Sequence, residues 1–168
     1  MDGQQKFDDI KCVSKTNLIF IELLHALSVE LDGRAGGYLC VSDMEGLPVF
    51  LLRMGEMPEE KLNQYYTNAL EKALRLSYTR QFAGYTLSRD SRDEERQRWT
   101  GAISGKSLIW SFSGFPEDCD EMFMVTLALG YGDISYHEAC VLLNVGHLNE
   151  HPYFKKMDGL LKSLAGTR

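Results

Sequence analysis

The chain has 168 residues, of which 44% are hydrophobic and 25% charged, a balance typical of one globular domain with its own core. The formal net charge of −6 argues against nucleic acid or an anionic membrane as the main partner. No apolar run is long enough to cross a bilayer, and the polar start at residues 1–5 is unlike a signal peptide, so we expect a cytoplasmic protein. We expect free thiols at the four widely spaced cysteines, which are Cys12, Cys40, Cys119 and Cys140.

Residues 14–31 are rich in Leu and Ile and predict a first helix, which the glycines from Gly33 onward end. Its apolar side chains are spread over more than one side, which favours burial against a sheet and also against a partner subunit. One stripe holds Leu18, Ile21, Leu24, His25 and Ser28, and beside it lie Phe20, Leu23, Leu27 and Leu31. His25 is either a core histidine or, if this helix lines a pocket, an axial ligand for haem iron.

Residues 38–43 and 47–53 predict two antiparallel strands joined by a turn at Gly46. Pro48 cannot donate a hydrogen bond to a neighbouring strand, so the second strand is expected at an edge of the sheet. Pro58 then opens an amphipathic helix that lasts to about Tyr78. Its predicted buried stripe consists of Leu62, Tyr65, Tyr66, Ala69, Leu70, Ala73 and Leu74. The ordinary interpretation of Lys72, off the centre of that stripe, is a solvated ammonium on a half-buried stem.

Residues 80–88 form either a short extended segment or an irregular loop. The charged run 89–98 is expected on the surface, as a solvated loop or a short helical turn. The stretch 99–121 predicts a strand, a turn, a second strand, a tight loop and the start of a helix. Leu108, Trp110 and Phe112 alternate with smaller residues, so they should face the core together. Asp118 is expected to cap the helix 118–129. The loop before it is either a simple connection or a place where anions bind.

The C-terminal part predicts two more helices. Ser135 and Glu138 have the spacing of a capping box and begin a helix that runs to about residue 145, and residues 153–165 form the last helix. His147 and His151 have the H-x-x-E-H spacing of one class of zinc proteases, but the proline after His151 disfavours a helix there, so we expect a connector. Spacing reveals no nucleophile, base or metal site, and whether the chain is an enzyme stays open.

The order of the elements resembles the GlcG-like family, also called the haem-degrading domain family. The likeness covers about residues 14–130. It rests on the hairpin Val41–Phe50, on Ala69-Leu-Glu-Lys72-Ala73, on Tyr85-Thr86-Leu87 and on Ser113-Gly114-Phe115-Pro116 with the following Asp120-Glu121. The charged run 89–98 replaces a Gly-rich segment of the family, and the helices from Ser135 onward look like an extension.

The resemblance implies an α+β fold, an α-β-α sandwich of the profilin-like kind with a central antiparallel sheet. We therefore expect a single domain over residues 1–168 with a helical extension from about residue 133. It also implies homo-oligomers with a ligand pocket near Lys72, Thr86, Ser113 and Gly114. Two functions follow as expectations: binding of a small molecule, with haem or a related tetrapyrrole as the candidate, or an oligomeric interaction domain of profilin-like or roadblock-like fold without such a ligand.

Overall fold

The computed structural model describes residues 10–166, with side chains from residue 13 onward, and shows a mixed α+β fold. Its sheet has the strand order β2-β1-β4-β3 and is antiparallel throughout. The strands are β1 (Ala35–Ser42), β2 (Pro48–Glu56), β3 (Ala102–Ser104) and β4 (Ile109–Ser113). The helices are α1 (Ile10–Ala26), α2 (Leu62–Ala83), α3 (Glu117–Gly130), α4 (Tyr136–Leu142) and α5 (Phe154–Gly166), with short 3-10 turns at η2 (Glu59–Lys61) and η3 (Ser88–Ser91).

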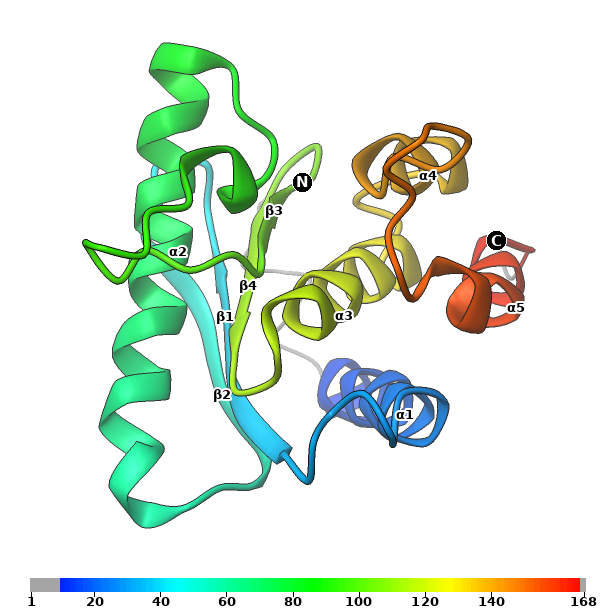
Figure 1. Cartoon of the computed structure of the whole chain (residues 1–168), viewed down its shortest axis with the longest axis horizontal. Coiled ribbons are helices and arrows are strands. Elements are labelled where there is room, and N and C mark those ends of the chain that lie inside the picture. The colour runs from blue at the N-terminus through cyan, green and yellow to red at the C-terminus, as the bar shows by residue number, and fades with distance from the viewer. Residues whose placement is uncertain (1–9, 167–168) are drawn as a thin grey trace.

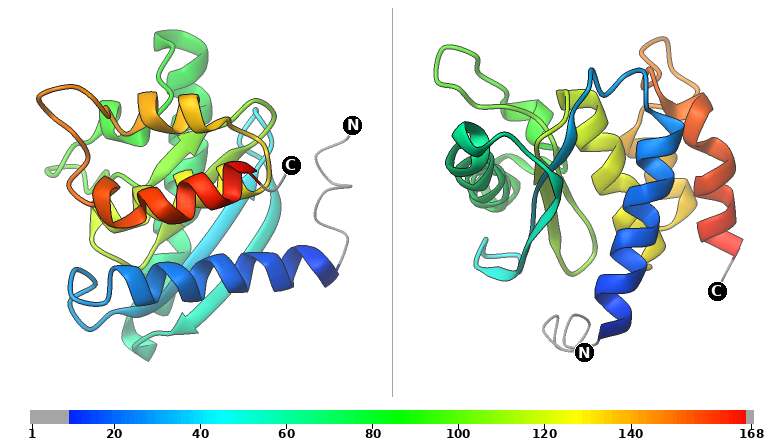
Figure 2. Two further views of the ribbon diagram at one scale, coloured as in Figure 1. Left: turned by 90° about the vertical axis from the view of Figure 1, so that its right-hand side faces the viewer. Right: turned by 90° about the horizontal axis from the view of Figure 1, so that it is seen from below.

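Helices cover both faces of the sheet. Figure 1 shows α2 alone against one face and α3 on the other, with α4 and α5 outside α3. Figure 2 shows that α1 lies on the same side as α3 and α5. These positions confirm an α+β fold with a central antiparallel sheet, and β2, which begins at Pro48, lies at the predicted edge. No helix within residues 10–166 has the length and apolar character needed to cross a membrane.

The sheet face toward α3 carries the large apolar core. Trp110 and Phe112 point into it together with Leu108, as the alternating pattern predicts, and all three are buried. Phe112 lies 5.0 Å from Phe123 and 4.9 Å from Phe115, measured between ring centroids. Aromatic side chains bury large areas in such clusters, so this face holds most of the apolar surface that folding removes from water.

The face toward α2 is packed with smaller side chains. Ala69 and Ala73 are buried against the sheet, which lets α2 approach it closely. The hydroxyl of Ser111, on β4, donates to the carbonyl oxygen of Ala69 at 2.6 Å. Lys72 and Arg75 are also buried here, so this layer between helix and sheet is partly polar.

The structure corrects several details of the predicted helices. The buried side of α1 holds Phe20 and Leu23, and Leu27 is buried directly after the helix ends, whereas Leu18 and Ile21 of the other predicted stripe are exposed. The helix ends at residue 26, and turns follow as far as residue 33. Leu74, predicted to be buried, is 58% exposed, and residues 75–77 are buried instead. The buried face of α2 is therefore rotated around the helix axis relative to the predicted stripe. Helix α2 also runs five residues further than predicted, to Ala83, and Gly84 ends it in a left-handed conformation.

Two helix ends also differ from the predictions. Helix α3 begins at Glu117, directly after Pro116, so Asp118 lies inside its first turn and is not its N-cap. The capping box of Ser135 and Glu138 is present, but α4 ends at residue 142, before the predicted end. Cys40 and Cys119 are buried free thiols and Cys140 is a half-buried one, while the side chain of Cys12 lies outside the described part.

Candidate functional site

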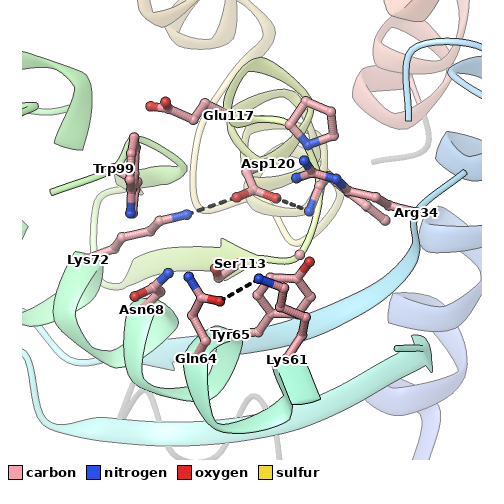
Figure 3. Close-up of a pocket in the computed structure, with 13 residues that line it drawn as sticks. Arg34, Lys61, Gln64, Tyr65, Asn68, Lys72, Trp99, Ser113, Glu117 and Asp120 are labelled. Atoms are coloured by element: carbon pink, nitrogen blue, oxygen red, sulfur yellow. Dashed lines mark hydrogen bonds and ion pairs between the residues drawn. The ribbon is translucent and has the colours of Figure 1, made fainter. Parts of the chain in front are cut away.

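A polar pocket lies at the end of the sheet where β4 stops, between the N-terminal half of α2 and the first turn of α3 (Figure 3). Its volume is about 400 Å³. The lining residues are Arg34, Lys61, Gln64, Tyr65, Asn68, Lys72, Trp99, Ser113, Gly114, Phe115, Pro116, Glu117 and Asp120. Those between positions 61 and 72 recur at helical spacing, so they form one polar face of the helical segment formed by η2 and α2.

A buried ion pair between Lys72 and Asp120 forms one side of this pocket. The ammonium nitrogen of Lys72 lies 2.8 Å from Asp120 Oδ2 and donates to the carbonyl oxygen of Phe112 at 2.8 Å. Only 2% of Lys72 is exposed, so the prediction of a solvated ammonium is wrong. The prediction failed because the partner carboxylate comes from a helix that begins 45 residues later, which spacing along α2 does not show.

The Lys72–Asp120 ion pair has hydrogen-bonding capacity left for a ligand. Burial raises the pKa of Asp120 to about 6, although the Lys72 ammonium opposes that shift. Asp120 Oδ1 also accepts the backbone N–H of Phe115 at 2.9 Å. An ammonium has three N–H donors, and two of those of Lys72 have acceptors in the described structure. The third is therefore free to donate to a molecule in the pocket.

Gly101 allows the two charged side chains to meet. Its φ of +110° is a conformation that residues with a Cβ rarely adopt, and a Cβ there would lie 2.6 Å from the Cβ of Asp120 and 3.0 Å from Lys72 Nζ. Any side chain at this position would push the ion pair apart. The glycine thus belongs to the architecture of the pocket even though it does not line it.

The wall opposite Arg34 is built by Trp99 and Glu117. Glu117 lies 3.0 Å from the guanidinium of Arg92 and accepts the backbone N–H of Thr100 at 3.0 Å. Partial burial would raise the pKa of Glu117, but the hydrogen bonds from Arg92 and Thr100 outweigh burial and lower it. Glu117 is therefore an ionised carboxylate that is already paired with a cation outside the pocket.

The charged run 89–98 supports this wall and is only partly free in solvent. The buried guanidinium of Arg75 donates to the carbonyl oxygens of Ser88 at 2.9 Å and Trp99 at 2.5 Å, which fixes both ends of the run. Arg89 forms an ion pair at 2.8 Å with the buried carboxylate of Glu121, whose pKa burial raises to about 7. The 3-10 turn η3 agrees with the predicted short helical turn, but the prediction of a solvated segment missed the contacts that hold the run against α3.

Of the predicted site residues, Lys72, Ser113 and Gly114 lie together in the pocket. Thr86 does not line it; its side chain is exposed and its carbonyl oxygen accepts the N–H of Ser104 at 2.9 Å beside β3. His25 is exposed on α1, on the α3 side of the sheet, and lines neither this pocket nor the hollow beside it. A polar stripe from Lys61 to Lys72 at helical spacing was the available signal for the part of the site that this helical segment forms.

His147 and His151 lie in a connector, as predicted. Residues 143–153 form turns without a regular helix, and residues 10–166 contain no group of three or more His, Cys, Asp or Glu side chains arranged to hold a metal. His151 is buried, and its Nδ1 accepts the backbone N–H of Tyr153 at 3.3 Å. Burial lowers the pKa of His151 to about 4, so the imidazole is neutral at pH 7.

Comparison of this chain with protein-family models, with curated proteins and with solved structures gives no match. The resemblance to the GlcG-like family therefore stays a prediction. What the site can do has to be argued from its own geometry.

Proposed function

We propose that this chain is a small-molecule binding protein and that its ligand is an anion held in the pocket between α2 and α3. The observation that carries the proposal is an excess of positive charge. The two carboxylates of the pocket already have cationic partners: Asp120 pairs with Lys72, and Glu117 pairs with Arg92, which lies outside the pocket and also contacts Glu94. Arg34 and Lys61 remain, and no carboxylate of the described residues pairs with either of them.

The surroundings of these two cations favour a bound anion over free ions in water. Among the side chains that the structure describes, the Lys61 ammonium donates to one acceptor, the neutral amide oxygen of Gln64, at 3.1 Å. Figure 3 shows Arg34 extending toward Asp120 from the side opposite Lys72. Arg34 and Lys61 are both exposed, so a carboxylate placed between them can reach both cations and accept charge-assisted hydrogen bonds from each.

A haem or another tetrapyrrole stays one candidate ligand, in keeping with the profilin-like sandwich that we propose for the fold. A second hollow of about 570 Å³ adjoins the pocket and shares Arg34, Lys61, Tyr65 and Gly114 with it. Together they form a trough that could take a ligand larger than either, with its carboxylates on the two cations. His25 lines neither hollow, so we expect a haem held in the trough not to depend on it.

The first experiment is a thermal-shift titration of the purified protein with acetate, benzoate, phosphate and haemin. We expect saturable stabilisation by at least one of these anions, because binding to the folded state alone raises the unfolding temperature. A variant with Arg34→Gln and Lys61→Gln should lose the effect, whereas His25→Ala should keep it. Absence of stabilisation by all four anions in the wild-type protein would overturn the proposal.

An oligomeric interaction domain is the second candidate, and exposed apolar side chains favour it. Phe82, on α2, is 73% exposed and packs against the exposed Tyr78, with ring centroids 4.6 Å apart. Leu18 and Ile21 are exposed on α1. If these side chains hold a homo-oligomer together, sedimentation velocity should show a species larger than 19.1 kDa that Phe82→Ser or Ile21→Ser dissociates. A monomer at all concentrations would exclude this candidate.

A further inference from the structure

We propose that the pocket selects a flat heteroaromatic ring that carries one carboxylate. This inference rests on the proposed function, since it names the class of ligand that the same pocket would take. Three features of the lining lead to it: the position of the cations relative to Trp99, the amide groups between them, and the acidic residues of the adjoining hollow.

The pocket has a cationic end and an aromatic end. Figure 3 shows Arg34 and Trp99 on opposite sides of Asp120, with the side chains of α2 lying below all three. A ligand that contacts both ends must therefore have an anionic group at one side and a surface suited to an indole at the other. Aromatic rings stack on indole in offset geometry and gain more than the burial of their area.

Trp99 is held in place before any ligand arrives. Its carbonyl oxygen accepts a hydrogen bond from the buried guanidinium of Arg75, and the guanidinium carbon of Arg92 lies 5.9 Å from the ring centroid. Arg92 does not line the pocket, so it contacts the indole from outside and leaves the inner side for a ligand. A preorganised ring loses little conformational entropy on binding, which favours a rigid, flat partner.

Two amides lie between the ends of the pocket. Figure 3 shows the side chains of Gln64 and Asn68 next to each other, facing the side of the pocket that Asp120 forms. Lys61 donates to the amide oxygen of Gln64, so the NH₂ group of Gln64 keeps its donors for other partners. A ring nitrogen with a free lone pair would accept from such a donor, and a purely hydrocarbon ring would leave it without a partner.

The adjoining hollow explains why a single negative charge fits best. Its lining includes Asp32, Glu56 and Glu60 together with the shared Arg34 and Lys61. A second anionic group that reached past the two cations would meet these carboxylates and be repelled. The same repulsion separates the proposed class from dicarboxylates.

Nicotinate, benzoate and cyclohexanecarboxylate form a matched series for the test, because all three are monocarboxylates of similar size. Isothermal titration should rank them in that order, with about tenfold between nicotinate and cyclohexanecarboxylate. The aromatic acids should also quench the fluorescence of Trp99, which lines the pocket. The other tryptophan, Trp110, is fully buried in the core on the α3 side, so its fluorescence should not respond to the ligand. Trp99→Leu should remove the quenching and reduce the preference for an aromatic ring.

Two surface variants keep the test independent of folding. Gln64→Leu should abolish the advantage of nicotinate over benzoate, and Asn63→Leu, one position away on the same helix and outside the pocket, should leave it unchanged. Equal binding of all three acids, lost in Arg34→Gln, would overturn the inference and leave the proposed function standing. Binding of acetate or phosphate alone would do the same. Failure of every anion to bind would overturn both.

Discussion

The two faces of the sheet are built from different kinds of side chain, and the pocket belongs to one of them. Toward α3, large apolar and aromatic groups fill the core around Phe112. Toward α2, the cluster of apolar residues is small and consists largely of short side chains, and buried polar groups such as Lys72 and Ser111 lie within the same layer. Neighbouring residues of β4 therefore serve opposite purposes: Phe112 packs the core, and Ser111 ties the sheet to α2.

This difference suggests a division between the stability of the fold and its chemistry. An apolar layer needs only complementary shapes, whereas a buried polar group has to find a partner or lose its hydration without compensation. On the α2 face each buried charge has such a partner, and at the end of β4 the layer opens so that Lys72 reaches the pocket. Substitutions on the two faces should accordingly have different consequences.

The largest effect is expected for Phe112→Ala. Removing this ring leaves a cavity among Phe20, Phe115 and Phe123, and we expect the free energy of unfolding to fall by about 4 kcal/mol. Urea denaturation at pH 7 measures it. Ser111→Ala, the adjacent position on the other face, is the matched control and should cost about 1 kcal/mol, the value of one hydrogen bond. Equal losses would show that the two faces contribute alike.

Lys72→Met is expected to destabilise the protein by about 3 kcal/mol, because it leaves the buried Asp120 without its cation. The raised pKa of Asp120 lets the carboxyl take up a proton in the variant, so the loss should be smaller at pH 5 than at pH 8. The double variant Lys72→Met and Asp120→Leu should recover most of the stability, since an apolar pair of similar volume needs no charge partner. A double variant as unstable as the single one would argue that the pair itself stabilises the fold.

Local patterns predicted the elements of this fold, and contacts distant in sequence decided the site. The hairpin around Gly46 and the capping box at Ser135 depend on residues within a few positions of each other, so the sequence alone was sufficient for both. Lys72 and Asp120 are 48 residues apart, and no sequence pattern in α2 or in α3 indicates that these two residues form an ion pair. The burial of Lys72 and its pairing with Asp120 depend on the way in which α2 and α3 meet at the end of β4.

Local sequence patterns predicted only part of the pocket lining. Lys72, Ser113 and Gly114 came from an ordered set of short motifs, and the structure brings these three together. Arg34 and Trp99 lie in segments between regular elements, where no periodicity assigns a side chain to a face. Their position depends on where the turns after α1 and the charged run end, which is a property of packing rather than of local pattern.

His151 should make the stability of the α3 side depend on pH. Its folded pKa of about 4 lies below the ordinary value of 6.5, so between these limits the unfolded chain binds a proton that the folded one does not. The stabilising contribution is therefore complete above pH 6.5 and lost as the pH falls toward 4. We expect the difference in unfolding free energy between wild type and His151→Phe to change by about 2 kcal/mol from pH 7 to pH 4.5.

The measurement has to be a difference between variants because other groups act in the opposite direction. The raised pKa values of Asp120, about 6, and Glu121, about 7, give contributions that are complete at low pH and decline as the pH rises through those values. They are common to the wild type and to His151→Phe and cancel in the comparison. Asp118 and Arg89 are the charged groups that influence His151, and both are retained. A pH-independent difference would show that His151 titrates normally in the folded protein.

The smallest effect on stability is expected for Arg92→Ala, and this substitution separates folding from binding most cleanly. The side chain of Arg92 is 37% exposed, and an ion pair in such a position, here with Glu117, contributes about 0–1 kcal/mol.

Without Arg92, however, the charge of Glu117 faces the pocket uncompensated and opposes a bound carboxylate. We expect the free energy of unfolding to change by less than about 1 kcal/mol while benzoate binds about threefold more weakly, an effect that about 0.5 M salt should reduce. Glu94→Ala, which removes the other partner of Arg92 and keeps the contact to Glu117, is the matched control and should change neither quantity. If benzoate binds equally well to Arg92→Ala, the charge of Glu117 does not affect a bound carboxylate. The excess of positive charge that we assign to the pocket would then not depend on the ion pair between Arg92 and Glu117.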